Sequence, residues 1–255
     1  MKIIGLAGLF FVTACLYASV GFGGGSTYTA LLAISGTDYH LIPVIALICN
    51  ILVVSGNVAR YTRAGLLDFG RILPLVIFSV PAAWLGGRLE ISETVFIGLL
   101  WAALLIAGLR LLFGKKPQTE ITASNNKYNF MNACIGGFIG FYSGLVGIGG
   151  GIFLAPILHF MRWGTALQIA ATCSLFILVN SLSGIWGQMT KLDNLARLGD
   201  ITPYWPLFPA VILGGLIGNF IGVTRLSDTL LKRLTGALIL VVALRLAWRW
   251  LNLML

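Results

Sequence analysis

Gly21-Phe22-Gly23-Gly24-Gly25 is the stretch that decides how this chain folds, because Gly147-Ile148-Gly149-Gly150-Gly151 repeats its glycine spacing 126 residues later. Both copies lie within strongly apolar sequence. Glycine lacks a Cβ atom, so a run of glycines weakens a helix and lets other groups approach the bare backbone. In a lipid bilayer such exposed backbone is tolerated only where it is buried in protein or lines a polar cavity. We therefore expect two paired helix breaks that face each other and form a binding site.

The composition around these motifs is that of a membrane protein. The chain has 255 residues, of which 58% are hydrophobic and 10% charged, and its mean hydropathy is +0.95; ordinary globular domains have roughly 25% charged residues. About 17–25 apolar residues suffice to cross a bilayer. The net charge of +9 comes mainly from basic residues in short loops between apolar stretches, a pattern typical of positive-inside topology. We predict an all-α polytopic membrane protein that has the lipid bilayer, and no nucleic acid, as a partner.

The four cysteines do not indicate a disulfide or a metal site. Cys15, Cys49, Cys134 and Cys173 all lie in apolar segments, without a C-x-x-C pair or a histidine at ligand spacing. Small buried hydrophobic side chains are the simpler interpretation. The sequence has no P-loop and no acidic residue in the middle of an expected span. We therefore expect no metal, no cofactor and no enzymatic activity.

A second level of repetition extends over the whole chain. Asp68 and Pro74 match Asp200 and Pro206 at a shift of 132 residues, and Ser92-Glu93-Thr94 matches Ser227-Asp228-Thr229 at a shift of 135. These matches predict an internal duplication of a four-segment unit. The predicted parts are a first repeat over 1–114, a polar cytoplasmic linker over 115–128 and a second repeat over 129–255.

The expected segments of the first repeat are a glycine-broken one that begins at residues 3–20, spans over 41–58 and 72–89, and a fourth ending near Phe113. If each broken segment crosses the membrane once, the chain has eight spans and parallel halves. If each is a re-entrant hairpin, it has six full crossings and inverted halves. About 30 residues of helix reach roughly 45 Å, which is ample for one broken crossing. The sequence favours about eight spans and keeps the hairpins as the alternative.

The helix that starts after each motif predicts an anion site. The first turn of a helix has unpaired N–H groups carrying roughly half a positive charge, and two such ends at a repeat interface can hold an anion without a buried lysine. The next span of each half adds amide, hydroxyl and thiol groups within apolar sequence. The candidate substrate-binding residues are Gly23, Gly24, Gly25, Ser26, Asn50, Asn57, Gly149, Gly150, Gly151, Thr172, Cys173, Ser174 and Asn180. The alternative is that the glycines only permit close helix packing and the polar groups only join helices.

The paired motifs, the second within the run GIGGGIFLAPIL (147–158), resemble the TauE/SafE sulfite exporter family, as does the run ALQIAATCS (166–174). The resemblance covers essentially the whole chain. One departure is Ala30, which stands where the second copy has Pro156.

The resemblance implies a multi-pass secondary carrier of the bacterial inner membrane that moves sulfite or a small organosulfur anion. The alternatives are a passive anion channel and a membrane thiol or redox protein that uses Cys49 and Cys173. The anion, the direction of transport, coupling to protons and a homo-oligomeric assembly are left open.

Overall fold

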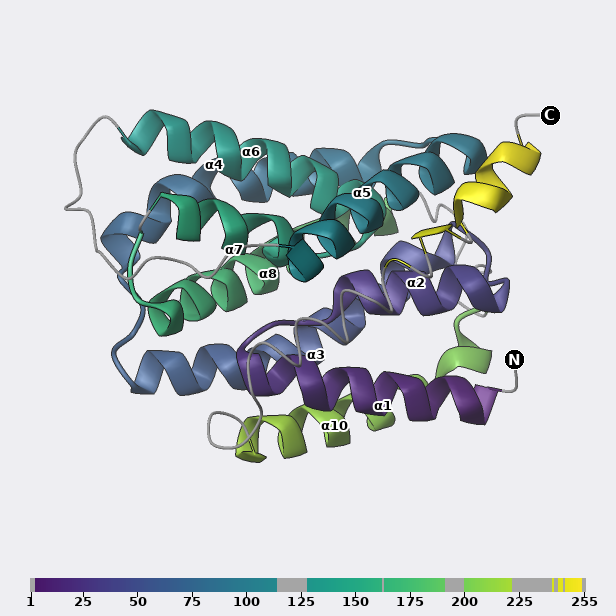
Figure 1. Ribbon diagram of the computed structural model, residues 1–255, viewed down its shortest axis with the longest axis horizontal. Helices are drawn as coiled ribbons and strands as arrows, with labels where there is room; N and C mark the ends of the chain where they lie inside the picture. The colour runs from purple at the N-terminus through teal and green to yellow at the C-terminus, as the bar shows by residue number, and fades with distance from the viewer. Residues whose placement is uncertain are drawn as a thin grey trace.

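The computed structural model describes residues 3–113, 128–161, 163–190, 200–221, 240, 243–244 and 246–253, which are helical with short connections and contain no strand (Figure 1). The first half contains α1 (Ile3–Val20), α2 (Gly25–Ser35), α3 (Leu41–Arg63), α4 (Phe69–Arg88) and α5 (Glu93–Phe113). The second half contains α6 (Tyr128–Val146), α7 (Gly151–Phe160), α8 (Ala166–Met189), the short 3-10 helix η1 (Thr202–Tyr204) and α10 (Leu207–Ile221), followed by a helical stretch over 246–253. The predicted linker, apart from Tyr128, and the Ser227-Asp228-Thr229 match lie outside the described residues.

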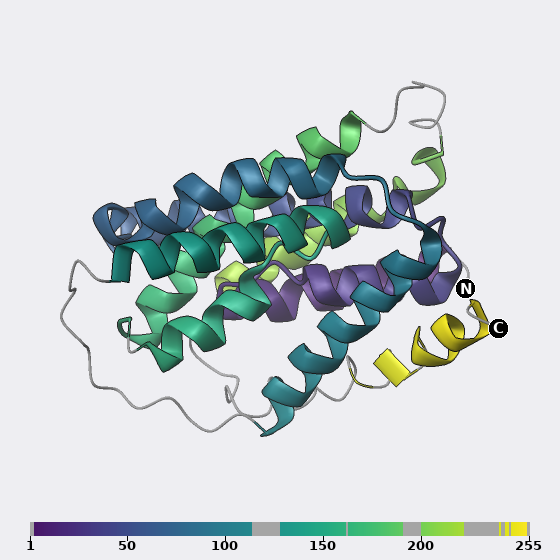
Figure 2. The same cartoon turned by 90° about the horizontal axis from the view of Figure 1, so that it is seen from above.

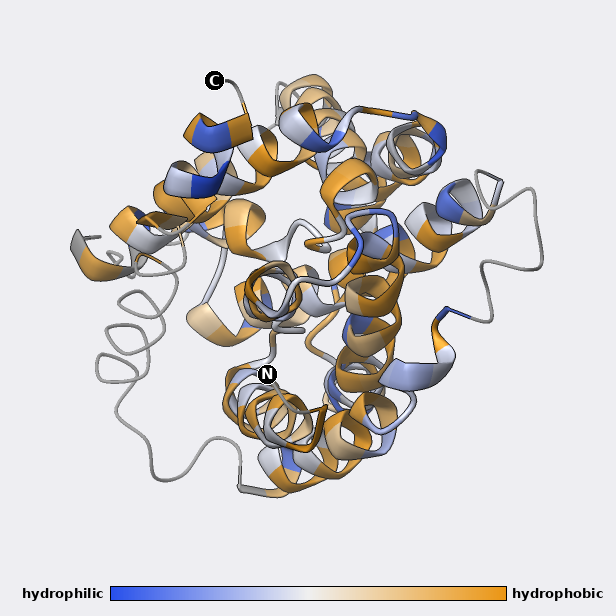
Figure 3. Cartoon of the chain, turned by 90° about the vertical axis from the view of Figure 1, so that its right-hand side faces the viewer, coloured by the Kyte–Doolittle hydropathy of each residue, from blue (hydrophilic) through white to orange (hydrophobic). Residues whose placement is uncertain are grey.

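Five of the described helices are long and apolar enough to cross a membrane: α1, α3, α4, α5 and α8. Large apolar side chains are exposed on their outer faces and on α10, for example Phe78 at 56%, Trp186 at 71% and Phe220 at 93%. Figure 3 shows the hydrophobic colour over most of the helical surface. A bilayer is the solvent that such a surface requires, so the prediction of an all-α polytopic membrane protein is confirmed.

The helix boundaries follow from local capping signals. The side chain of Asp68 accepts a hydrogen bond from the backbone N–H of Arg71 at 3.3 Å and so begins α4. Thr165 and Gln168 form a capping box at the start of α8. The expected span over 41–58 continues to Arg63, with Arg60 and Arg63 in its last turn, where a positive charge stabilises the helix.

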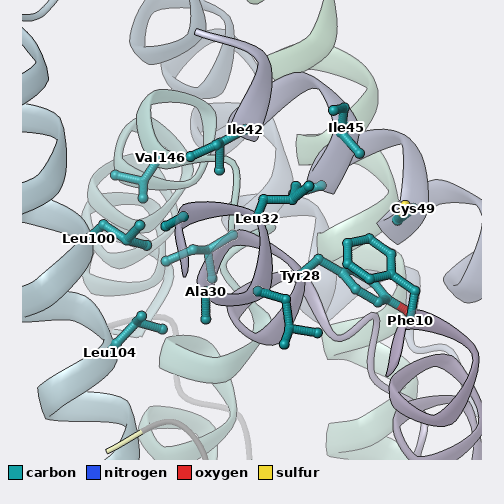
Figure 4. Close-up of a cluster of buried hydrophobic side chains, with 14 of the residues drawn as sticks. Phe10, Tyr28, Ala30, Leu32, Ile42, Ile45, Cys49, Leu100, Leu104 and Val146 are labelled. Atoms are coloured by element: carbon teal, nitrogen blue, oxygen red, sulfur yellow. The ribbon is translucent and has the colours of Figure 1, made fainter. Parts of the chain in front are cut away.

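The chain reverses direction at each glycine motif. The rings of Phe10 on α1 and Tyr28 on α2 stack with centroids 4.7 Å apart, and the Tyr17 hydroxyl lies 3.0 Å from the Thr27 hydroxyl. In a continuous helix, residues 10 and 28 would be roughly 27 Å apart. Figure 1 shows α2 running back towards the end of the molecule at which α1 begins, and Figure 4 shows the stacked rings.

The second motif makes the same reversal between α6 and α7, where Tyr142 and Phe153 meet edge to face at 5.8 Å. The chain therefore turns back at both motifs, as the hairpin alternative expects, rather than continuing in one direction through a broken crossing. The cause is local: Gly21 and Gly24 have φ of 85° and 86°, and Gly147, Gly149 and Gly150 have φ of 81°, 85° and 77°. Residues with a Cβ rarely adopt this left-handed conformation, and its repetition within a few residues turns the chain back.

The two helices after the hairpins, α3 and α8, form the centre of the molecule and run antiparallel, since Leu47 near the start of α3 meets Gly184 near the end of α8. Around them, α1 packs against α10 and α6 against α4, while α4 packs against α8 and α10 against α3. Figure 2 shows α4 and α6 side by side along their length.

Glycines outside the motifs permit this close packing. A Cβ atom at Gly136, Gly140 or Gly144 of α6 would overlap the carbonyl oxygens of Leu75, Ser79 or Ala83 of α4. Gly214 and Gly218 of α10 meet α1 in the same way, at the carbonyl oxygens of Phe11 and Cys15. Small residues spaced four apart therefore bring these helix backbones into contact, as is common for helices in membranes.

Candidate functional site

The two glycine motifs touch each other near the middle of the molecule. A Cβ atom at Gly25 would overlap the carbonyl oxygen of Ile148 and would lie 2.5 Å from the side-chain amide nitrogen of Asn50. A Cβ atom at Gly151 would lie 3.6 Å from the ring of Phe22. From this contact, α2 and α7 run away in opposite directions (Figure 1). The structure thus brings together segments that are 126 residues apart in the sequence.

Both helices begin at this contact without a side-chain cap. The N-cap residues are Gly24 and Gly150, both in the left-handed conformation, and neither start has a side-chain hydrogen bond to its first turn. Each helix start carries roughly half a positive charge on its unpaired N–H groups. The described carboxylates lie at helix ends or in loops, away from this contact. Two positive helix ends that face each other without a neutralising carboxylate favour an anion.

Two side chains join the halves across this contact. Asn50 of α3 donates from its amide nitrogen to the Ile148 carbonyl oxygen at 3.2 Å, and Ser174 of α8 donates from its hydroxyl to the Gly21 carbonyl oxygen. Each central helix therefore binds the motif of the other half. The amide oxygen of Asn50 is buried beside Gly23 and has no hydrogen-bond partner among the described residues.

The other polar candidates form no hydrogen bond between the halves among the described residues, and the amide oxygen of Asn180 has no partner there. Thr172 and Asn180 donate to the carbonyl oxygens of Gln168 and Phe176, four residues earlier in their own helix. Cys173 packs in an apolar cluster with Ile139 and Leu154. Asn57 is two turns beyond Asn50 on α3 and fully buried. Ser26 is buried in the first turn of α2.

Sequence reasoning missed Tyr61 and left Gly21, which belongs to the first motif, out of the candidate binding residues. The hydroxyl of Tyr61 lies against Gly21, and Tyr61 is 3% exposed. Tyr61 stands eleven residues after Asn50, three helical turns along the same face of one helix. This helical spacing is the signal by which the sequence could have indicated it.

The site is closed in this structure. Residues 23–30 and 143–151 are all buried. A Cβ atom at Gly149 would lie 2.6 Å from the amide nitrogen of Asn50 and 3.0 Å from Ile177. A hollow of about 370 Å³ lies elsewhere, on the outer face of α8, lined by Leu182, Ile185, Trp186, Met189 and Thr190. The expected space between the helix ends is thus filled by backbone and side chains.

Comparison with known proteins places the chain in a family. The family model of the sulfite exporter TauE/SafE matches residues 6–246. The chain belongs to this family. It is 34% identical over 247 residues to the probable membrane transporter protein y4hK of Sinorhizobium fredii, and the match covers 96% of this chain and 98% of that protein.

A probable membrane transporter protein of Xylella fastidiosa is 29% identical over 162 residues, which are 61% of this chain and 58% of that one. No solved structure gives a significant match. The TauE/SafE chain is accordingly a multi-pass membrane protein of a transporter family.

Two of the four cysteines, Cys49 and Cys173, lie in the apolar core. Cys49 and Cys173 are buried free thiols that belong to different apolar clusters, and Figure 4 shows Cys49 next to Phe10 and Tyr28. We expect a variant with Cys49→Ala and Cys173→Ala to keep anion flux within about twofold of wild type, because these side chains serve only in packing. Flux into proteoliposomes measures this. Loss of flux in a double variant that elutes as folded protein would support the redox alternative instead.

The bond from Ser174 to the Gly21 carbonyl gives a second prediction. In Ser174→Ala this buried carbonyl oxygen loses its side-chain donor, which costs about 1–3 kcal/mol. Ser19→Ala is the matched control, since the Ser19 hydroxyl donates to the Leu16 carbonyl oxygen within α1 and so joins no other part of the chain. Thermal unfolding in detergent should show a lower midpoint for Ser174→Ala than for Ser19→Ala. Equal midpoints would mean that the bond between the halves contributes nothing to stability.

Proposed function

We propose that this protein is a secondary transporter that moves a small sulfur-containing anion, sulfite or a small organosulfonate, across the bacterial inner membrane. The observation that carries the proposal is the meeting of two uncapped helix starts, at Gly24 and Gly150, with no carboxylate of the described residues beside them. Backbone N–H groups and helix dipoles can bind the oxygens of an oxyanion without a buried cation. The family description names sulfite export, which fits a ligand of this charge and size.

The proposal includes an inverted internal duplication with six full crossings and two re-entrant hairpins. It is supported by packing that is the same from either half. The first helix of the first half, α1, packs on α10 as the first helix of the second half, α6, packs on α4, and α4 packs on α8 as α10 packs on α3. The bonds from Asn50 to Ile148 and from Ser174 to Gly21 form a further matched pair. Inverted repeats with helix starts meeting at the repeat interface suit a carrier that opens to either side in turn.

In this mechanism the closed contact is the occluded form of the carrier. When one hairpin moves away from the other, the amides of the first turns of α2 and α7 become accessible from one side of the membrane. The amide nitrogen of Asn50, which holds the Ile148 carbonyl oxygen in the closed form, then becomes free to donate to the anion. Rocking of the halves around Asn50 and Ser174 exposes the same amides to the other side.

Flux into proteoliposomes tests the function. Sulfite, sulfate, thiosulfate, sulfoacetate and taurine are offered in turn, each with and without an imposed pH gradient. A carrier gives saturable flux that responds to a gradient, whereas a passive channel gives conductance that follows voltage alone. Absence of flux for every one of these solutes would overturn the proposed substrate class.

A further inference from the structure

Away from the central contact, α3 carries a second group of polar side chains near its C-terminal end. Asn57 is fully buried, and neither its amide nitrogen nor its amide oxygen has a partner among the described residues. Leaving a buried amide unpaired destabilises the folded state, and native structures rarely contain one without a ligand, water or ion to satisfy it.

A cation and a phenol lie one turn further along the same helix. Arg60 donates to the carbonyl oxygen of Asn219 on α10 at 3.1 Å and to the Tyr61 hydroxyl at 3.3 Å, and its guanidinium lies 4.9 Å from the centre of the Tyr61 ring. Because the Tyr61 hydroxyl accepts from Arg60, its own proton is available to another acceptor. The side-chain amide of Asn219 approaches Gly56, whose Cβ position lies 2.5 Å from its nitrogen.

These groups continue from the central site. Asn50, Asn57 and Tyr61 are seven and four residues apart, so they share one face of α3. Asn57 therefore lies roughly 10 Å along the helix from Asn50, on the way to the membrane surface. The described carboxylate nearest along the chain, Asp68, is exposed and caps α4 instead. Arg60 thus contributes a positive charge that no described acidic side chain pairs.

We propose that Asn57, Arg60 and Tyr61, with Asn219 facing them from α10, form an outer binding site for a small oxyanion on the path to the glycine motifs. The inference rests on the proposed function, since the anion that stops at this site is the one that is transported. The amide N–H of Asn57, the guanidinium N–H and the phenol O–H are donors that the oxygens of an oxyanion can satisfy, and the charge of Arg60 selects a negative ligand. The amide oxygens of Asn57 and Asn219, which have no partner among the described residues, accept from a protonated ligand oxygen or from water. In a purely structural role Arg60 only binds the last turn of α10 and no anion reaches it from the aqueous side, so a cysteine at position 57 would not be labelled with a preference for anions.

The test measures charge selection at Asn57 itself. In a full-length protein with the four cysteines replaced by alanine, Asn57→Cys is reacted in proteoliposomes with two methanethiosulfonates, one bearing a sulfonate and the other a trimethylammonium group. Each rate is divided by the rate of the same reagent with a small free thiol in solution. We expect this relative rate to be about tenfold higher for the anionic reagent than for the cationic one, because Arg60 attracts it. Comparing the two reagents on one thiol cancels any change in the reactivity of that thiol.

Two further variants assign the preference to Arg60. Arg60→Gln should bring the two rates together, whereas Arg63→Gln, which changes an exposed arginine one turn on, should leave the preference intact. If Asn57→Cys fails to fold, Asn219→Cys, which is half-buried on the facing helix, is labelled in its place. Equal rates, no labelling of either cysteine, or a preference that survives Arg60→Gln would overturn the outer site.

The labelling rates do not depend on transport, so the two proposals can fail separately. Charge-selective labelling in a protein without flux for any tested anion would leave the outer site standing and remove the carrier. Saturable flux without charge-selective labelling would leave the carrier standing and remove the outer site.

Discussion

Replacing Gly25 by alanine is expected to lower anion flux below about a tenth of the wild-type value while the protein still inserts and folds. The added methyl group would overlap the Ile148 carbonyl oxygen and lie 2.5 Å from the amide nitrogen of Asn50. The first of these is a backbone atom, so no side-chain rotation relieves the overlap, and the two helix starts must shift apart. The amides that are proposed to bind the anion would then no longer converge. Flux into proteoliposomes and elution from a sizing column measure the two properties separately.

Gly8→Ala is the matched control for this substitution. Gly8 also lies in an apolar helix of the first half, but nothing stands within 4 Å of its Cβ position, so the methyl group is accommodated there. Gly24 and Gly150 are poorer test positions, because φ values of 86° and 77° strain any side chain whatever the space around it. Normal flux in Gly25→Ala would remove the contact between the motifs from the mechanism.

The sequence was sufficient to predict the helices but not the path of the chain between them. Apolar length alone predicted α1 over residues 3–20 and the end of α5 near Phe113, because crossing a bilayer needs little more than enough apolar residues. The reversal between α1 and α2 depends on the left-handed conformation of Gly21 and Gly24 and on the stacking of Phe10 on Tyr28. Glycine permits that conformation without requiring it, so the sequence favoured the simpler broken crossing.

Some of the candidate residues on the central helices bond to the other half of the chain, and others bond only to their own helix. Asn50 and Ser174 were both candidates on the span that follows a glycine motif, and both donate to the motif of the other half. Thr172 and Asn180 lie on the same helix as Ser174 and bond to their own backbone, which residue type alone does not distinguish. Arg60 was interpreted as a topology signal, since its partner Asn219 lies 159 residues away and only the fold brings the two together.

Gly144→Val is expected to destabilise the whole protein by about 1–3 kcal/mol or more, because three helix backbones meet at this residue. A Cβ atom at Gly144 of α6 would overlap the Ala83 carbonyl oxygen of α4 and lie 2.9 Å from the Gly87 nitrogen. On the other side, the Gly144 carbonyl oxygen accepts a hydrogen bond from the Gln188 side chain of α8 at 2.8 Å. Helices without a hydrophobic driving force between them depend on such close contact, so separating α4 from α6 weakens their association.

Thermal unfolding in detergent and protection from protease measure this loss, with Gly137→Val as the control. Gly137 lies two turns earlier in α6, and its Cβ position has only Phe78 near it, at 3.9 Å, so valine fits there. Both substitutions change helix propensity alike, and their difference therefore reports the packing of α6 on α4. If the two variants unfold at the same temperature, close backbone contact at Gly144 is not what holds these helices together, and the apolar side chains between them must carry their association instead.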